Sequence, residues 1–141
     1  MSLKMESISY ETQIDLAKYR IQRAYETQED AKLLLNRKSY NSATNRFYYA
    51  IFYAIRALLA TKGLDSSKHS GVISLFHKEF VKTGIIAKEF AKIPNFGFEK
   101  RTDGDYEDYH IFTQGEVEEL ADKCSLFIAE VKKALNKILQ V

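Results

Sequence analysis

The stretch Asn45–Ala60, NRFYYAIFYAIRALLA, decides the fold class of this 141-residue chain. Five aromatic residues fall within the seven positions from Phe47 to Tyr53, and alanines recur along one helical row. Apolar side chains occupy most of the helical circumference. A helix that is apolar on most sides is buried at the centre of its domain. The stretch therefore predicts a central helix over residues 40–62.

Apolar residues at steps of three and four predict further helices on both sides of this one. The last of them carries a start signal, because Thr113 and Glu116 form a capping box and Phe112 and Val117 a hydrophobic staple. The chain is thus expected to be all-α, an antiparallel up-and-down bundle of four long helices plus a short helix. The predicted helices span about 12–36, 40–62, 70–83 and 114–139, with the short one over about 86–93.

One domain is expected, since the length suits a single core. Residues 12–141 form that helical domain, and residues 1–11 are expected to be a flexible N-terminus in which 1–3 are attributed to cloning. The single cysteine, Cys124, lies on the apolar seam of the last helix and is expected in the core. One cysteine, no signal peptide and no membrane-length apolar run suit a cytoplasmic protein.

The net charge is +2 and the sequence pI is about 8.5, so charge permits a nucleic-acid partner without arguing for one. Neither composition nor motifs indicate a metal or another cofactor. The acidic repeat that begins at Asp103 has the alternation of a calcium loop, but Asp108 stands where such a loop needs glycine, and Gln114 where it needs glutamate. The three histidines lack the spacing of a zinc site.

The polar stretch RTDGDYEDYH, residues 101–110, is expected to be a loop with two open interpretations. Arg101 could clamp a phosphate with its planar guanidinium, and His110 could exchange protons near neutral pH. Alternatively, Arg101 pairs only with neighbouring aspartates. Asn45 and Arg46 are open in the same way, because polar groups on an apolar helix either bond to other helices or line a cleft opposite Arg101.

Three segments together resemble the HEPN-domain family, in particular its small stand-alone prokaryotic members. They are the central stretch NRFYYAIFYAIRALL, the later KHSGVISLF, and Arg101 followed by Asp105 and Tyr106. The resemblance spans about residues 12–139. It implies a helical bundle that usually dimerises. Many such proteins are metal-independent endoribonucleases, often toxins or defence components encoded beside a nucleotidyltransferase-like antitoxin.

In the catalytic members an arginine is followed closely by a histidine, whereas here eight residues separate Arg101 from His110. The resemblance implies an RNA- or nucleotide-binding, homodimeric component of a toxin–antitoxin or defence gene pair. Arg101 and His110 would act in any cleavage, with Asp105, Tyr106, Asn45 and Arg46 in binding. The alternatives are a non-catalytic module that binds a nucleotide or a nucleotidyltransferase-like partner, and a helical dimer whose motif residues only brace the interface.

Overall fold

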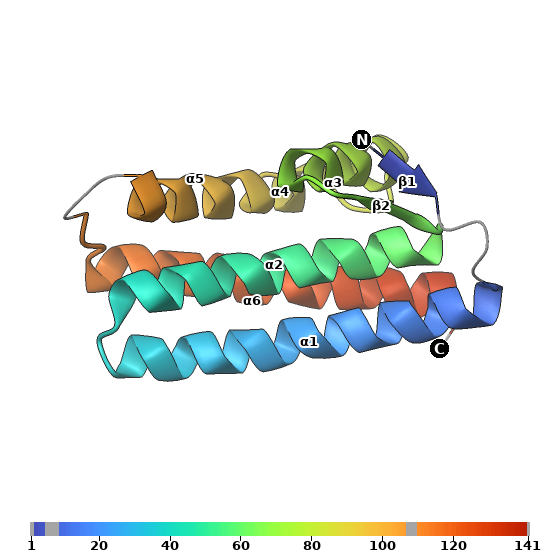
Figure 1. Cartoon of the computed structure of the whole chain (residues 1–141). Helices are drawn as coiled ribbons and strands as arrows, with labels where there is room; N and C mark the ends of the chain where they lie inside the picture. The colour runs from blue at the N-terminus through green and yellow to red at the C-terminus, as the bar shows by residue number, and fades with distance from the viewer. Residues whose placement is uncertain (1, 5–8, 107–109, 141) are drawn as a thin grey trace.

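The chain folds as an all-α helical bundle, as the sequence predicts. The computed structural model describes residues 2–4, 9–106 and 110–140, and the side chains of 2–4 and 103–106 lie outside this description. Four helices run lengthwise and alternate in direction (Figure 1). They are α1 (Tyr10–Asn36), α2 (Tyr40–Thr61), α5 (Ile93–Tyr106) and α6 (Gln114–Leu139).

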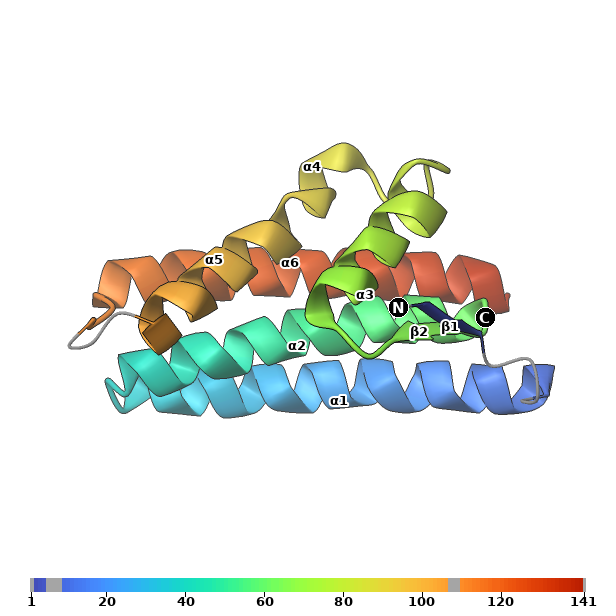
Figure 2. The same ribbon diagram turned by 45° about the horizontal axis from the view of Figure 1, so that its top comes forward.

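Shorter elements cover one side of α2 and α6, where they lie beside α5 (Figure 2). They are β1 (Ser2–Lys4), β2 (Leu64–Ser66), α3 (His69–Phe76), η1 (His77–Val81) and α4 (Lys88–Ala91). Helix α3 continues directly into the π-helical turn η1, so the predicted helix over 70–83 forms but does not join the lengthwise four. A two-stranded antiparallel ribbon pairs β1 with β2 in the register Leu3 opposite Asp65.

Helix α2 is the centre of the core, as its sequence predicts, because thirteen of its residues are buried and it packs against α1, α3, α5 and α6. One row of mostly apolar residues on α1 packs against α2. Gln28 is the polar residue in that row, and its side chain is buried. The Gln28 side chain accepts a hydrogen bond from the Cys124 thiol at 3.9 Å. Burial raises the pKa of Cys124 to about 12, so this thiol is a core residue rather than a nucleophile.

The start of α6 matches its prediction. The Thr113 hydroxyl accepts from the Glu116 backbone N–H at 3.2 Å, and the Glu116 carboxylate accepts from the Thr113 backbone N–H at 3.3 Å. The flanking pair, Phe112 and Val117, is buried. Two backbone donors that the helix cannot satisfy itself are thereby satisfied, which fixes the start of the helix.

The prediction of a loop at residues 101–106 is wrong, because α5 continues through Tyr106. Pro94 is the second residue of α5 rather than the end of a preceding helix. Proline is compatible with the first turn of a helix, where its missing N–H has no intrahelical partner. Arg101 therefore projects from a helix, whereas residues 107–109 lie outside the described chain.

Candidate functional site

Arg101 lies against two tyrosines of the central helix. Its guanidinium carbon is 5.4 Å from the ring centroids of both Tyr48 and Tyr49, and Nη2 donates to the Tyr49 hydroxyl at 3.5 Å. Guanidinium groups are attracted to the negative faces of aromatic rings at such distances. Arg101 and Tyr49 are 52 positions apart in the sequence, and their contact joins helices α5 and α2 at this point.

Gly97 explains how α5 reaches this position. A Cβ atom on Gly97 would lie 3.3 Å from Ile51 Cδ1 and 3.5 Å from Tyr48 Cδ1, so the glycine permits a close approach of α5 to α2. Arg101 follows Gly97 by four residues and shares its face of the helix. The residue that allows close packing therefore also directs Arg101 toward the tyrosines.

Arg46, which lies on α2, also contacts the Tyr49 ring. Its guanidinium carbon is 5.0 Å from the Tyr49 centroid, and Nη2 donates to Asn45 Oδ1 at 3.2 Å. Within the described part of the chain, no carboxylate lies at ion-pair distance from Arg46. We call Arg46, Tyr48, Tyr49 and Arg101 the arginine–tyrosine cluster.

A surface hollow of about 490 Å³ adjoins this cluster. Its lining comes from the end of α1 and the first turns of α2, and comprises Leu34, Asn41, Ser42, Asn45 and Arg46. Two of the predicted binding residues, Asn45 and Arg46, therefore line a hollow, and Arg46 connects this hollow to Arg101 through the Tyr49 ring.

His69 lies beside the arginine–tyrosine cluster. The sequence did not predict it as a site residue. Its Nδ1 lies 3.0 Å from the Tyr48 hydroxyl, and its ring centroid is 4.3 Å from that of Phe52. The ring also meets Tyr49 edge-on at 6.1 Å. The segment KHSGVISLF contains this histidine and was the available signal, but a sequence does not show that the start of α3 folds back onto Tyr48.

Burial and charge shift the acidity of the groups in this region. Desolvation, followed by the charges of Arg101 and Arg56, lowers the pKa of His69 below its ordinary value. Burial raises the pKa of Tyr48 to about 12, although the charge of Arg101 opposes that shift. Near neutral pH the region therefore combines arginine cations with a neutral imidazole and a protonated phenol.

The structure gives less detail on the other predicted site residues, His110, Asp105 and Tyr106. His110 packs its ring against Phe112 at 4.5 Å, and its backbone carbonyl accepts from Asn41 Nδ2 at 2.7 Å. His110 therefore lies next to the α6 cap and the first turn of α2. The side chains of Asp105 and Tyr106 lie outside the described residues, although their backbone belongs to α5.

Arg56, further along α2, belongs to a different network. The Asp65 carboxylate accepts from Arg56 Nη2 at 2.6 Å and from Arg20 Nη2 at 3.4 Å, and Arg20 also donates to the Arg56 carbonyl at 3.1 Å. Burial raises the pKa of Asp65, but hydrogen bonds from Arg56 and the Ser66 N–H outweigh it and leave that pKa lowered. This network ties α1, α2 and β2 together.

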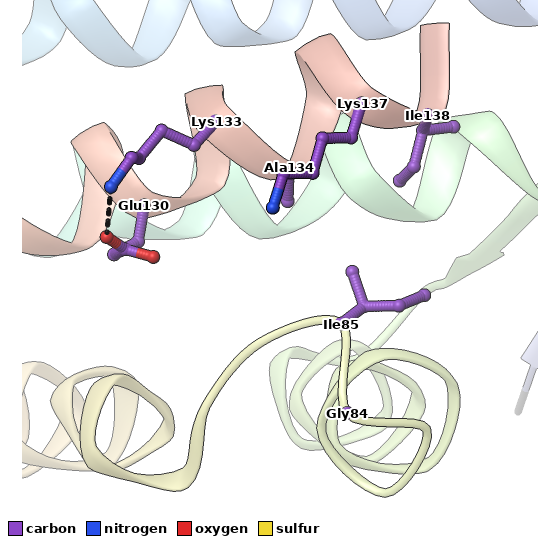
Figure 3. A pocket seen from close by; sticks show the side chains of 7 residues that line it. All are labelled: Gly84, Ile85, Glu130, Lys133, Ala134, Lys137 and Ile138. Atoms are coloured by element: carbon purple, nitrogen blue, oxygen red, sulfur yellow. Dashed lines mark hydrogen bonds and ion pairs between the residues drawn. The ribbon is translucent and has the colours of Figure 1, made fainter. Parts of the chain in front are cut away.

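A second hollow, of about 360 Å³, lies between the loop at Gly84 and the C-terminal part of α6 (Figure 3). Lys133 and Lys137 border it, and Lys133 pairs with Glu130 at 3.3 Å. None of the predicted site residues lines it. Across the described residues, no three His, Cys, Asp or Glu side chains are grouped to hold a metal ion, and no described helix has the length and apolarity to cross a membrane.

Comparison with known proteins identifies the family. The chain is 43% identical over 123 residues to a "UPF0332 protein" of Thermotoga maritima, which covers 87% of this chain and 93% of the relative. It is 33% identical over 135 residues to "Putative toxin MJ0142" of Methanocaldococcus jannaschii, covering 96% and 90%. "Putative toxin MJ0605" of the same organism is 38% identical over 119 residues, covering 84% and 88%.

A family model described as the HEPN domain matches residues 17–134. This match begins in α1 and ends in α6, so it includes the complete central helix, His69 and the Arg101 helix. A match over so much of the bundle concerns the whole domain rather than one motif, and the chain is a member of the HEPN family.

Proposed function

We propose that this protein binds RNA or a nucleotide through its phosphate groups at the arginine–tyrosine cluster, in the role of a toxin-type HEPN protein. The observation that carries the proposal is the convergence of Arg46 and Arg101 on the single Tyr49 ring. Both guanidinium groups lie within 5.4 Å of the centroid of that ring, and guanidinium groups donate charge-assisted hydrogen bonds to the oxygens of a phosphate bound beside them. The relatives named as toxins support the role.

The remaining features of the site suit the same ligand. The Tyr49 ring is only partly buried, and tyrosine faces stack on nucleobases without strong sequence preference. The hollow beside Asn45 and Arg46 offers space next to the cations. A nucleotidyltransferase-like partner and a homodimer remain predictions that follow from the family resemblance.

Fluorescence anisotropy with a labelled single-stranded RNA in EDTA tests the binding site. We expect Arg101→Ala and Arg46→Ala each to weaken affinity by about tenfold, since a charge-assisted hydrogen bond is worth roughly 1.5–3 kcal/mol. Arg23→Ala is the matched control, because Arg23 lies over the Tyr53 ring of the same helix at 5.3 Å, outside the cluster. Equal affinity of wild type and both cluster variants would refute the proposed site.

Metal-independent RNA cleavage is a second candidate, favoured by the histidine imidazole that packs against the same two tyrosines as Arg101. Arginine can stabilise charge on a phosphorus-centred transition state, and histidine can transfer a proton. The test is an end-labelled single-stranded RNA incubated in EDTA with wild type, Arg101→Ala, His69→Asn and His110→Asn. Equal background cleavage by wild type and Arg101→Ala would leave binding without catalysis, which is the alternative function.

A further inference from the structure

The ring of His69 is held in place while one of its nitrogens is available. Tyr48 occupies Nδ1 through the 3.0 Å hydrogen bond, and Phe52 and Tyr49 fix the plane of the imidazole. The one hydrogen bond that His69 makes to residues in the described part of the chain is at Nδ1, and the residue as a whole is partly exposed. His69 and Arg101 both contact the rings of Tyr48 and Tyr49, so the imidazole lies on the same aromatic pair as the guanidinium.

Within the described part of the chain, the two charges that shift the pKa of His69 are both positive. Arg101 from α5 and Arg56 from α2 both lower the pKa of His69, whereas burial raises the pKa of Tyr48 to about 12 and keeps that phenol neutral near pH 7. The nearby carboxylate, Asp65 on β2, is engaged by Arg56 and Arg20. Among described residues no carboxylate lies within ion-pair distance of His69. The unliganded site thus disfavours an imidazolium.

We infer that His69 takes up a proton when a phosphate group binds beside Arg101, and thereby becomes a third cation of the binding site. The inference rests on the proposed function and adds a residue to it. The phosphate supplies a negative charge next to the imidazole, where the described residues place no carboxylate at ion-pair distance. The proton comes from solvent and adds to Nε2, which then donates to a phosphate oxygen, while Nδ1–H donates to the Tyr48 oxygen. No covalent bond is formed or broken.

The sign of the pH effect follows from linkage. Burial and the two arginines lower the pKa of His69 in the free protein, and a bound phosphate raises it again. Between those two values the complex holds more protons than the free protein. Affinity for the phosphate ligand therefore increases as the pH falls through this window, by up to about tenfold per pH unit for one proton.

Isothermal titration calorimetry measures this proton directly. The probe is a short oligouridine RNA with hydroxyl ends, because a terminal phosphate itself titrates near pH 6 and would add its own protons. Titrations at pH about 7 in buffers with different heats of ionisation give the number of protons bound per RNA. We expect a net uptake of about 0.3–1 proton for wild type.

Variants assign the proton to a residue. Proton uptake should fall close to zero in His69→Asn and in His69→Gln, and persist in the control His77→Asn. Thermal unfolding of each variant checks that it is folded. In the wild-type protein, NMR resonances of the His69 ring should move toward their protonated positions on addition of the RNA, which tests the proposal even if both His69 variants unfold.

The outcomes separate this inference from the function on which it rests. Binding of oligouridine without proton uptake, or with uptake unchanged in both folded His69 variants, overturns the role of His69 and leaves the arginine–tyrosine cluster intact. An absence of binding by wild type to both oligouridine and a free nucleotide overturns the proposed function itself. Uptake that disappears with His69 alone supports the inference.

Discussion

Asp65 is the residue on which two arginines depend for a counter-charge. Arg20 has only 8% of its surface exposed, and the Asp65 carboxylate bonds to both Arg20 and Arg56. A guanidinium that loses its carboxylate in such a place keeps its desolvation cost without compensation. The single carboxylate of Asp65 therefore stabilises contacts among α1, α2 and β2.

We expect Asp65→Asn to lower the free energy of unfolding by about 3 kcal/mol, because it leaves partly buried guanidiniums without their counter-charge. Urea denaturation measures this difference. Glu29→Gln, which removes the exposed pair between Glu29 and Lys32, is the control and should change stability by less than about 0.5 kcal/mol.

The same substitution has a defined pH dependence. The pKa of Asp65 is lowered in the folded state, so its stabilising contribution is complete above the unfolded pKa of about 4 and is lost as the pH falls toward the folded value. The difference in unfolding free energy between wild type and Asp65→Asn should therefore shrink below pH about 4. A difference that stays constant into acid would show that the charge is not responsible.

Helix α5 owes its position to one small residue. Gly97 lies within van der Waals distance of Ile51 and Tyr48 on α2 and of Leu120 on α6 once a Cβ is added. Any larger side chain must displace α5 or its neighbours. Since Arg101 is one turn further along the same face, such a displacement also moves the guanidinium away from Tyr48 and Tyr49.

We expect Gly97→Val to cost about 1–3 kcal/mol of stability through overpacking and to weaken RNA binding severalfold in the protein that remains folded. Denaturation and anisotropy report the two effects. Gly115→Ala is the matched control, because a Cβ there contacts nothing within 4 Å. It should leave binding unchanged and, at a helical glycine, raise stability by up to about 1 kcal/mol. Full RNA affinity in Gly97→Val would separate helix placement from the site.

The elements that the sequence predicted well are those with strong local signals. Helix α2 is apolar almost all round, and α6 begins at a capping box, so both were found close to their observed limits. Helix α5 contains Pro94, Gly97 and Gly104 and has little intrinsic preference to be helical. Packing against α2 and α6 stabilises it, and that contribution is not visible in a short stretch of sequence.

The candidate site, too, was only partly predictable from the sequence. Arg46 and Arg101 were each predicted as site residues from the sequence. That both contact the Tyr49 ring depends on how α5 crosses α2. His69 was missed because its partner, Tyr48, lies 21 residues earlier and the contact arises only when α3 folds back. Residue chemistry can be read from the sequence, whereas the juxtaposition of these side chains requires the tertiary structure.

At the scale of the whole molecule, the charge is nearly balanced, with 21 basic and 19 acidic residues. Such a surface attracts polyanions weakly overall, so local arginines must supply the electrostatic part of RNA binding. We expect the logarithm of the RNA binding constant to fall with the logarithm of salt concentration with a slope of about −2, corresponding to about three neutralised phosphates.

Anisotropy titrations at several salt concentrations measure this slope. Removing one phosphate contact by Arg101→Ala or Arg46→Ala should make it shallower by about 0.7, whereas Arg23→Ala should leave it unchanged. A slope that is the same in all four proteins would show that the bound RNA makes its phosphate contacts elsewhere on the surface.

The contact of Tyr49 with two guanidiniums also has a spectroscopic consequence. The chain contains no tryptophan, so its intrinsic fluorescence comes from nine tyrosines alone. A Tyr49→Trp substitution puts the only indole of the protein against both Arg46 and Arg101, and indole is the strongest aromatic partner for such cations. Light at the red edge of the absorption band would then excite that indole alone, so its fluorescence would report ligand binding at the site without an added label.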